Sequence, residues 1–476
     1  MSMAPTTSRH AWEPDPLTPE RRDRTVAEQL RGLAARVHFY AGLFVAPFIV
    51  IAALSGALYA LSPTLERVLY HDQINATETT TPQPLAVQIA AAQHHFPDLT
   101  LSEVWPADVP GVATRVLFSD DDLDDGLDRV VFVDPADASV NGDLTSYSGL
   151  GELPLRSWIS GLHRGLHLGA PGEIYSELAA SWLFVLALSG IFLWWRKVRA
   201  TRNRGLAPML TGLAARRGSR QKTMSLHATV GTWLVVAMLG IAATGLTWST
   251  FAGANISSVV TAMDWRTAPL QTSLNGEAAE TDPHAEHEDH LGVHTQHLST
   301  AGQAPTVLAA ARQVGLDGPL RMVAPTDADI AWTVSQQWGP WVFSSDSVAV
   351  DGTDGRLVDR LDFEDQSMYS KLSAWGIYLH MGIMFGLPLQ IALAATALGI
   401  VVLTITGYRM WWKRRPTRGG LPTALGTTNG TGWPVGMIAA VIALAVGLFL
   451  PLLGISLAVF VVVDILASLR AGRTRR

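Results

Sequence analysis

Long apolar runs alternate with polar segments along the whole chain. A helix needs about 20 apolar residues to cross a bilayer, and every run reaches that length. The last run is too long for one span, and Pro451 divides it, so we expect a hairpin of two helices there. The pattern predicts a polytopic α-helical membrane protein with about six transmembrane helices. The runs cover residues 37–61, 174–195, 226–249, 374–412 and 433–469.

The polar segments differ in charge and length. Two short segments, 196–225 and 413–432, are basic, and so are the chain ends, 1–36 and 470–476. Short basic segments mark the cytoplasmic side of a membrane protein. We therefore expect both termini in the cytoplasm. The two long segments, 62–173 and 250–373, are then extracytoplasmic.

Each long polar segment predicts a small α+β domain. Helices are expected at 84–96 and 305–314, each followed by strands with alternating apolar residues. A turn is expected at Asn141-Gly142. The predicted strands lie near residues 99–105, 113–118, 129–134, 320–324, 330–336, 347–350 and 356–361.

The membrane part contains an internal duplication. His163 recurs as His380, 217 positions later, and at the same offset Gly190 recurs as Gly407 and Trp194-Trp195 as Trp411-Trp412. A second match, at an offset of 189 positions, pairs His38, Gly42 and Gly56 with His227, Gly231 and Gly245. Repeats of this kind fix an architecture. The chain is therefore predicted to consist of two similar halves.

The amino-acid composition agrees with a membrane protein and excludes several kinds of metal and cofactor site. Hydrophobic residues make up 48% and charged residues 16% of the 476 residues, and the mean hydropathy is +0.21. There is no cysteine, which excludes disulfides, thiolate metal sites, cysteine-ligated iron–sulfur clusters and covalently attached haem. The net charge of −6 argues against nucleic acid as a partner.

Four repeat-matched histidines are the main chemical signal. On the expected topology His38 and His227 lie at the cytoplasmic ends of their helices, and His163 and His380 at the outer ends. Ionisable residues in membrane spans are by default functional. Two imidazoles on facing helices can fill both axial positions of a haem iron, which suits electron transfer. The sequence thus predicts one haem near each face, although a histidine at a helix end can also be a cap.

The length of the second helix leaves two arrangements open. A straight helix from His163 to Trp195 would span about 48 Å, more than the roughly 30 Å hydrocarbon core. Either the outer haem lies above the membrane, or residues 169–172 break the helix and fold His163 back. Pro388 offers the same break after His380. His167, one turn from His163, is an alternative ligand or a contact to a haem propionate or substrate.

Five histidines interleaved with acids form the densest local cluster of metal-ligating residues. This composition suits a labile zinc, copper or nickel site, or a solvated loop. The histidines are His284, His287, His290, His294 and His297.

These motifs together resemble the PepSY-associated transmembrane family. The resemblance rests on residues 38–42, Ser55-Gly56, residues 161–164, Thr244-Gly245 and residues 380–382, with both Trp-Trp-basic helix exits. It covers about residues 31–415 and implies that the outer segments are PepSY-like domains. The family includes bacterial inner-membrane ferric-siderophore reductases with two b-type haems. The resemblance therefore implies that His38, His163, His227 and His380 ligate two haems b. It also implies an oxidoreductase that reduces a ferric siderophore, or a similar ferric chelate, on the outer face.

The electron donor and two rival functions remain open. No Gly-rich dinucleotide fingerprint is present, and the cytoplasmic loops are too small for a flavin or nicotinamide domain. Electrons would therefore enter from the quinol pool or from a separate cytoplasmic reductase. One rival is a non-redox regulator that inhibits an extracytoplasmic protease. The other is a metal-binding accessory protein of transport.

Overall fold

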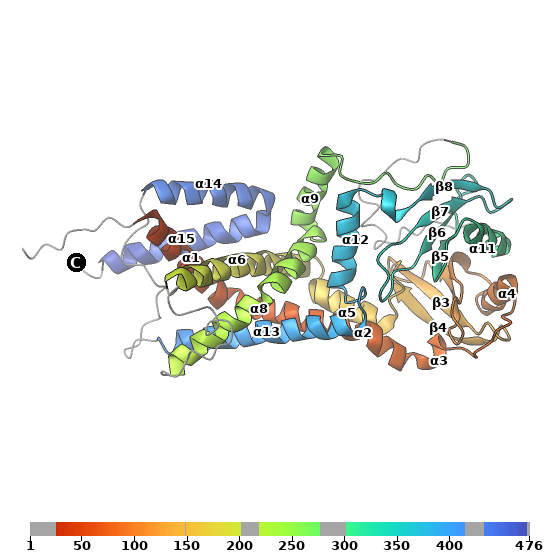
Figure 1. Ribbon diagram of the computed structural model, residues 1–476, viewed down its shortest axis with the longest axis horizontal. Coiled ribbons are helices and arrows are strands. Elements are labelled where there is room, and N and C mark those ends of the chain that lie inside the picture. The colour runs from red at the N-terminus through yellow and green to blue at the C-terminus, as the bar shows by residue number, and fades with distance from the viewer. Residues whose placement is uncertain (1–24, 148, 201–218, 277–300, 415–432, 474–476) are drawn as a thin grey trace, which may run out of the picture.

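A bundle of long helices forms one end of the molecule and a β-sheet forms the other (Figure 1). The computed structural model describes residues 25–147, 149–200, 219–276, 301–414 and 433–473. Within these residues, four helices are long and apolar enough to cross a membrane. They are Ala46–Leu69, Ala170–Arg199, Gln221–Thr247 and Leu387–Trp412.

Little of the four spans is buried inside the protein. In the apolar window of each span, at most 28% is buried. Trp233 and Val236 are 71% and 78% exposed, as side chains that face lipid would be. The chain is a multi-pass membrane protein. The expected count of six spans stays a prediction, because the described parts of the last two helices, Gly436–Phe449 and Pro451–Val462, are shorter.

Two expected helices are interrupted. The helix expected over 374–412 is divided, as the break left open at Pro388 allows: α12 (Met368–His380) ends at His380, and α13 (Leu387–Trp412) begins with Pro388 in its first turn. Gly382 and Gly386, both with positive φ, form the break. The first apolar run is also divided, into α1 (Val26–Phe44) and α2 (Ala46–Leu69), directly before Pro47.

A third break separates α5 from α6. Helix α5 (Pro154–Gly165) ends at Leu166 and His167, which both have positive φ, and α6 (Ala170–Ala200) follows Gly169. Of the two arrangements left open by the sequence, the structure has the folded-back one. His163 therefore lies on a short separate helix instead of on an extension of the span.

The two polar segments build one continuous sheet. All its strand pairs are antiparallel, in the order β4-β3-β2-β1-β5-β6-β7-β8. The halves join where Glu103 and Val104 of β1 pair with Val323 and Met322 of β5. The strands are β1 (Thr100–Trp105), β2 (Thr114–Ser119), β3 (Leu127–Val133), β4 (Val140–Tyr147), β5 (Leu320–Val323), β6 (Trp332–Gln336), β7 (Ser347–Val350) and β8 (Leu357–Leu361). The turn expected at Asn141-Gly142 is wrong, since both residues lie within β4.

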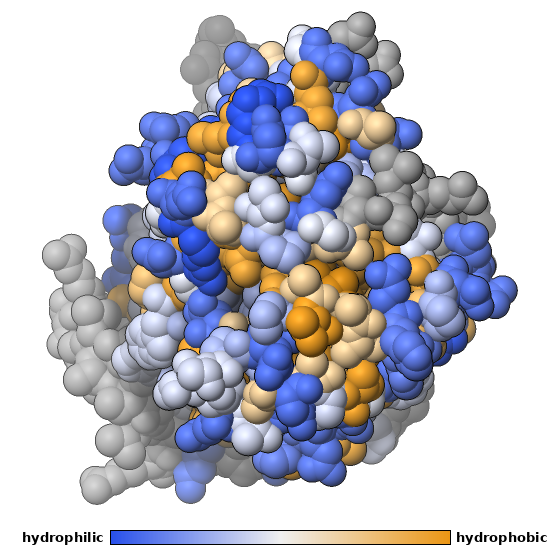
Figure 2. Space-filling model, turned by 90° about the vertical axis from the view of Figure 1, so that its right-hand side faces the viewer, coloured by the Kyte–Doolittle hydropathy of each residue, from blue (hydrophilic) through white to orange (hydrophobic). Residues whose placement is uncertain are grey.

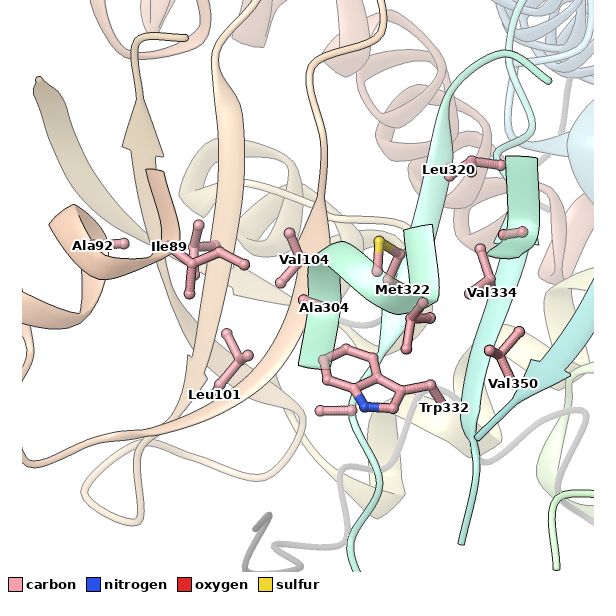
Figure 3. Packing of buried hydrophobic residues seen from close by; sticks show 14 of the residues in the cluster. Ile89, Ala92, Leu101, Val104, Ala304, Leu320, Met322, Trp332, Val334 and Val350 are labelled. Atoms are coloured by element: carbon pink, nitrogen blue, oxygen red, sulfur yellow. The ribbon is translucent and has the colours of Figure 1, made fainter. Parts of the chain in front are cut away.

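One face of the sheet is covered by α4 (Leu85–His95) and α11 (Ala304–Gln313), the two helices expected from the sequence. Ile89 of α4, Val104 of β1 and Trp332 of β6 pack in a single core that spans both halves (Figure 3). Burial of this apolar surface is what holds the two halves together.

The opposite face of the sheet packs toward the helical end. Trp105, Leu117 and Phe132 lie there against Leu153 and against Tyr70, at the end of α2. Glu103 and Arg321 form an ion pair across the β1–β5 junction, with Arg321 Nε 2.9 Å from Glu103 Oε2. Hydrophilic residues cover much of the sheet end of the molecule (Figure 2).

The remaining helices complete the bundle. Helix α8 (Ser219–Thr247) continues after a short break into α9 (Thr250–Ala262). Helices α14 (Trp433–Phe449) and α15 (Pro451–Arg473) pack against each other, as expected for the last apolar run. Short helices α3 (His71–Ile74), η2 (Ala301–Gln303) and η3 (Phe363–Asp365) lie in the sheet region.

Candidate functional site

The four repeat-matched histidines form two pairs. His163 of α5 and His380 of α12 face each other near the sheet, with ring centroids 6.3 Å apart. His38 of α1 and His227 of α8 face each other toward the other end of the bundle, with centroids 6.2 Å apart. We call these the sheet-side pair and the distal pair.

Each histidine is held by the same two-residue element on a neighbouring helix. A Ser or Thr oxygen lies within hydrogen-bond distance of the imidazole Nδ1, and the next residue is a glycine. The distances are 2.9 Å from His38 to Ser189, 3.1 Å from His163 to Ser55, 3.0 Å from His227 to Thr406 and 2.7 Å from His380 to Thr244. The glycines are Gly190, Gly56, Gly407 and Gly245.

The glycines leave room for the rings. A Cβ atom at Gly56 would lie 2.9 Å from His163 Cε1, and one at Gly190 would lie 3.2 Å from His38 Cε1. The corresponding distances are 3.7 Å for Gly245 and His380, and 3.9 Å for Gly407 and His227. The sheet-side and distal pairs thus each contain one tight contact and one ordinary one.

Each hydroxyl oxygen also lies within hydrogen-bond distance of a backbone carbonyl of its own helix, as Ser55 does of Ile51 at 3.0 Å and Thr244 of Gly240 at 2.8 Å. A hydroxyl has a single proton, so when it donates to this carbonyl it accepts from the histidine. The ring proton is then on Nδ1, and the Nε2 lone pair is available to a metal. Ser189 and Thr406 donate in the same way, to Val185 and Val402.

The donor set and the space fit a metal between paired imidazoles. Two nitrogens about 2 Å from one metal ion place the ring centroids about 6 Å apart, close to the distances of both pairs. The sheet-side pair lines a cavity of about 740 Å³, and the distal pair lines one of about 420 Å³. Both volumes lie in the usual range for cofactor sites. Apolar residues Ile49, Leu183 and Ile400 line both cavities and separate them.

A family model covers all four histidines. The model of the PepSY-associated TM region matches residues 35–414. The chain belongs to the PepSY-associated transmembrane family. The expected resemblance is thereby confirmed at the level of the family. A search of curated proteins finds no match to this family member.

The other predicted ligands fall in different places. His167 turns back onto α5, with its ring against Gly161 and 5.2 Å from the ring of Trp158, and it lines the sheet-side cavity beside His163. The cluster from His284 to His297 lies outside the described residues. Among the residues that are described, no group of three or more His, Asp or Glu side chains is arranged to hold a metal ion.

A buried polar network beside His163 was not expected from the sequence. Tyr59 of α2 stacks on His163, with ring centroids 6.3 Å apart and planes 14° apart, and donates a hydrogen bond to Glu152. The backbone N–H of Arg156 donates to Glu66 Oε1 at 2.9 Å, and its guanidinium donates to Tyr59 at 3.3 Å. The network ties the helix that carries His163 to α2.

Burial also changes the acidity of groups on the sheet face that packs toward the helices. It raises the pKa of Asp128 from 3.8 to about 7, with the negative charge of Glu103 acting in the same direction. Burial lowers the pKa of Arg115 to about 10, so that its guanidinium is still charged at neutral pH. Arg115 Nη1 lies 3.5 Å from the carbonyl of Gly151, in the loop that leads to Glu152.

Proposed function

We propose that the protein carries electrons across a bacterial inner membrane and reduces a ferric siderophore, or a similar ferric chelate, at the sheet side. Two haems b are the cofactors, one held by His38 and His227 and one by His163 and His380. The sheet then lies outside the cytoplasm and both termini lie inside. A quinol or a separate cytoplasmic reductase donates the electrons to the distal site.

The observation that carries this proposal is the fourfold repetition of one ligand environment. A single histidine with a hydroxyl partner is common in helical bundles. Four of them, in two facing pairs with ring centroids 6.2 and 6.3 Å apart, suit a bis-imidazole iron centre at each end of the bundle. His38 and His227 would hold one haem and His163 and His380 the other, and a haem held by two imidazoles would supply electron transfer.

The residues around the histidines orient the ligands and line the two cavities. The hydroxyls orient the imidazoles and strengthen them as ligands. The glycines allow a flat macrocycle to approach the helices. A bound haem supplies reversible one-electron chemistry. Because Ile49, Leu183 and Ile400 line both cavities, little protein separates the two sites and electrons have a short path.

Reduction of the chelate explains the release of iron. One electron converts Fe(III) to Fe(II), and the hard siderophore oxygens hold Fe(II) less tightly. Iron then dissociates on the sheet side. The loop from Gly149 to Glu152 lies between the sheet and the sheet-side cavity, so the sheet can place the chelate next to this site.

The test is a single-turnover assay with the purified protein. The protein is reduced anaerobically with limiting dithionite, a ferric siderophore is added, and Fe(II) is trapped with a chromogenic chelator. We expect reoxidation of the haem absorbance and one Fe(II) formed per electron lost. The His163→Ala variant, which keeps the distal pair, should reduce the chelate far more slowly. Reduced haem that is stable in the presence of several ferric chelates would contradict the assigned substrate class.

A further inference from the structure

The distal cavity has a rim of aromatic and cationic side chains at the last turns of α6 and α13. Trp194 and Lys197 of α6 line it, and so do Trp411 of α13 and Arg414, two residues beyond the end of that helix. These four residues are matched by the 217-residue offset, as Gly190 and Gly407 are. Each half of the chain thus contributes one indole and one cation to the same cavity.

The indole of Trp194 has an unused donor. Its Nε1 is buried and has no hydrogen-bond partner in the described part of the chain. A buried donor without an acceptor is unfavourable, because it has lost its hydrogen bond to water. This predicts that a ligand supplies the acceptor. Trp residues at helix ends often serve only as interfacial anchors. The adjacent Trp195 fits that role, because it is 43% exposed and stacks under Arg199 at 4.0 Å.

We propose that the two Trp–cation pairs bind the two carboxylates of the haem in the distal cavity, Trp194 with Lys197 binding one and Trp411 with Arg414 the other. This inference rests on the proposed function. A b-type porphyrin carries two propionates on one edge, and the remainder of the ring is apolar. A charge-assisted pair of donors for each carboxylate, on the rim of an otherwise apolar cavity, matches that distribution.

The assignment also orients the distal haem. Lys197 follows the histidine-contacting residue Gly190 by seven positions on α6, which is about two helical turns. Arg414 follows Gly407 by the same number of positions and lies two residues beyond the end of α13. The propionate edge therefore points away from the sheet and the apolar edge points toward Ile49, Leu183 and Ile400. In the sheet-side cavity the polar lining is different and includes Arg164 with the carboxylates of Glu152, Glu173 and Glu177.

The experiment measures the midpoint potential and the haem-transfer rate of the distal site in the full-length chain. The Trp194→Phe variant removes the donor and keeps the ring, and Lys197→Gln removes the charge. Either loss leaves a propionate less compensated, which favours Fe(III) and lowers the potential. We expect each variant to shift the reduction equilibrium about tenfold, which is about 59 mV for one electron. Transfer of haem from the distal site to an apoglobin should be about tenfold faster.

Two controls make the result specific. Trp195→Phe, one position away, should leave both values unchanged. Reconstitution of the wild-type chain with the dimethyl ester of haem should reproduce the effect of the variants, and the variants should then have no further effect. The ester experiment also applies if a variant fails to accumulate.

The outcomes separate this inference from the proposed function. Wild-type protein with two haems, together with variants that change neither value, would overturn the inference and leave the function standing. The same holds if the variants change only membrane insertion, because Trp194 and Lys197 would then be lipid anchors. Wild-type protein that binds no haem would remove the proposed function itself.

Discussion

The sheet-side and distal histidine pairs share their innermost contacts and differ in the polar residues around them. In both, a hydroxyl lies within hydrogen-bond distance of Nδ1 and a glycine makes space for the ring. Around the distal pair lie apolar residues and the two Trp–cation pairs. Around the sheet-side pair lie Tyr59, Glu152 and Arg164, next to the sheet. The shared part fits a common iron chemistry, and the different part fits different partners at the two ends.

The largest effect is expected when one histidine of a pair is replaced, because that pair loses its haem and the other pair keeps its own. His163→Ala and His380→Ala should each remove one of two haems per chain, because a bis-imidazole site loses an axial bond. His38→Ala should remove the other haem. Pyridine haemochrome analysis of the purified variants gives the count. Retention of both haems in His163→Ala would show that another residue, for example His167, is the ligand.

Replacing each of the four glycines by alanine should reduce haem retention to different degrees, according to how closely the new methyl group approaches the histidine. Gly56→Ala places a methyl group 2.9 Å from His163 Cε1, and Gly190→Ala places one 3.2 Å from His38, so each should displace its imidazole and weaken haem retention. Gly245→Ala and Gly407→Ala meet ordinary contacts of 3.7 and 3.9 Å and should be tolerated. Haem content measured in parallel for the four variants gives the order. Equal loss at all four positions would contradict the steric account.

The next smaller effect is expected when the hydroxyl beside a histidine is removed, because this changes the support of the ligand and keeps the ligand itself. Partners of metal ligands typically contribute about 10- to 100-fold to metal affinity. Thr244→Val should weaken haem binding by that order. Thr406→Val should have a smaller effect, because His227 Nδ1 also lies 3.1 Å from the carbonyl of Leu403. Equilibrium haem titration of the two variants is the measurement, and a larger effect of Thr406→Val would argue against the assigned Nδ1 protons.

The smallest expected effect lies in the sheet. The folded-state pKa of Asp128 is about 7, above its ordinary value of 3.8, so folded protein binds the proton more tightly than unfolded protein. The stabilisation is complete below about pH 4 and is lost as the pH rises through 7. Asp128→Asn should remove this dependence, which we expect to be on the order of 3 kcal/mol between pH 5 and pH 8 at about 1.36 kcal/mol per pH unit. Thermal unfolding of the full chain at pH 5 and pH 8 provides the test. Equal slopes for wild type and variant would contradict the shift.

Much of the fold follows from the local pattern of apolar and polar residues. The rest depends on contacts between residues that are far apart in the sequence. Helices α4 and α11 and seven of the eight strands have the expected periodicity, because one face of each is buried. The joining of two segments through β1 and β5 is not encoded in any local period. The bounds of α5 were not expected either, since its residues were assigned to a polar segment. The break after α5 was foreseen only as an option at residues 169–172, and the break after α12 only as an option at Pro388.

The candidate site could also be predicted in part from the sequence. The matched offsets in the sequence identified the four histidines and their glycines, because the same residue types recur at the same spacing. The role of Ser189 and Thr406 required the structure, because Ser and Thr in membrane helices usually bond only to their own backbone. The same applies to Tyr59, whose partner Glu152 is 93 residues away.

The most direct test of the account is a haem count and spectrum on the intact chain. A dithionite-reduced minus oxidised spectrum should show the bands of low-spin b-type haem, at two haems per chain. The His163→Ala and His38→Ala variants should each retain one haem, with different midpoint potentials. Colourless protein from haem-replete cells would contradict the central claim and would favour a non-redox regulator or a metal-binding accessory protein.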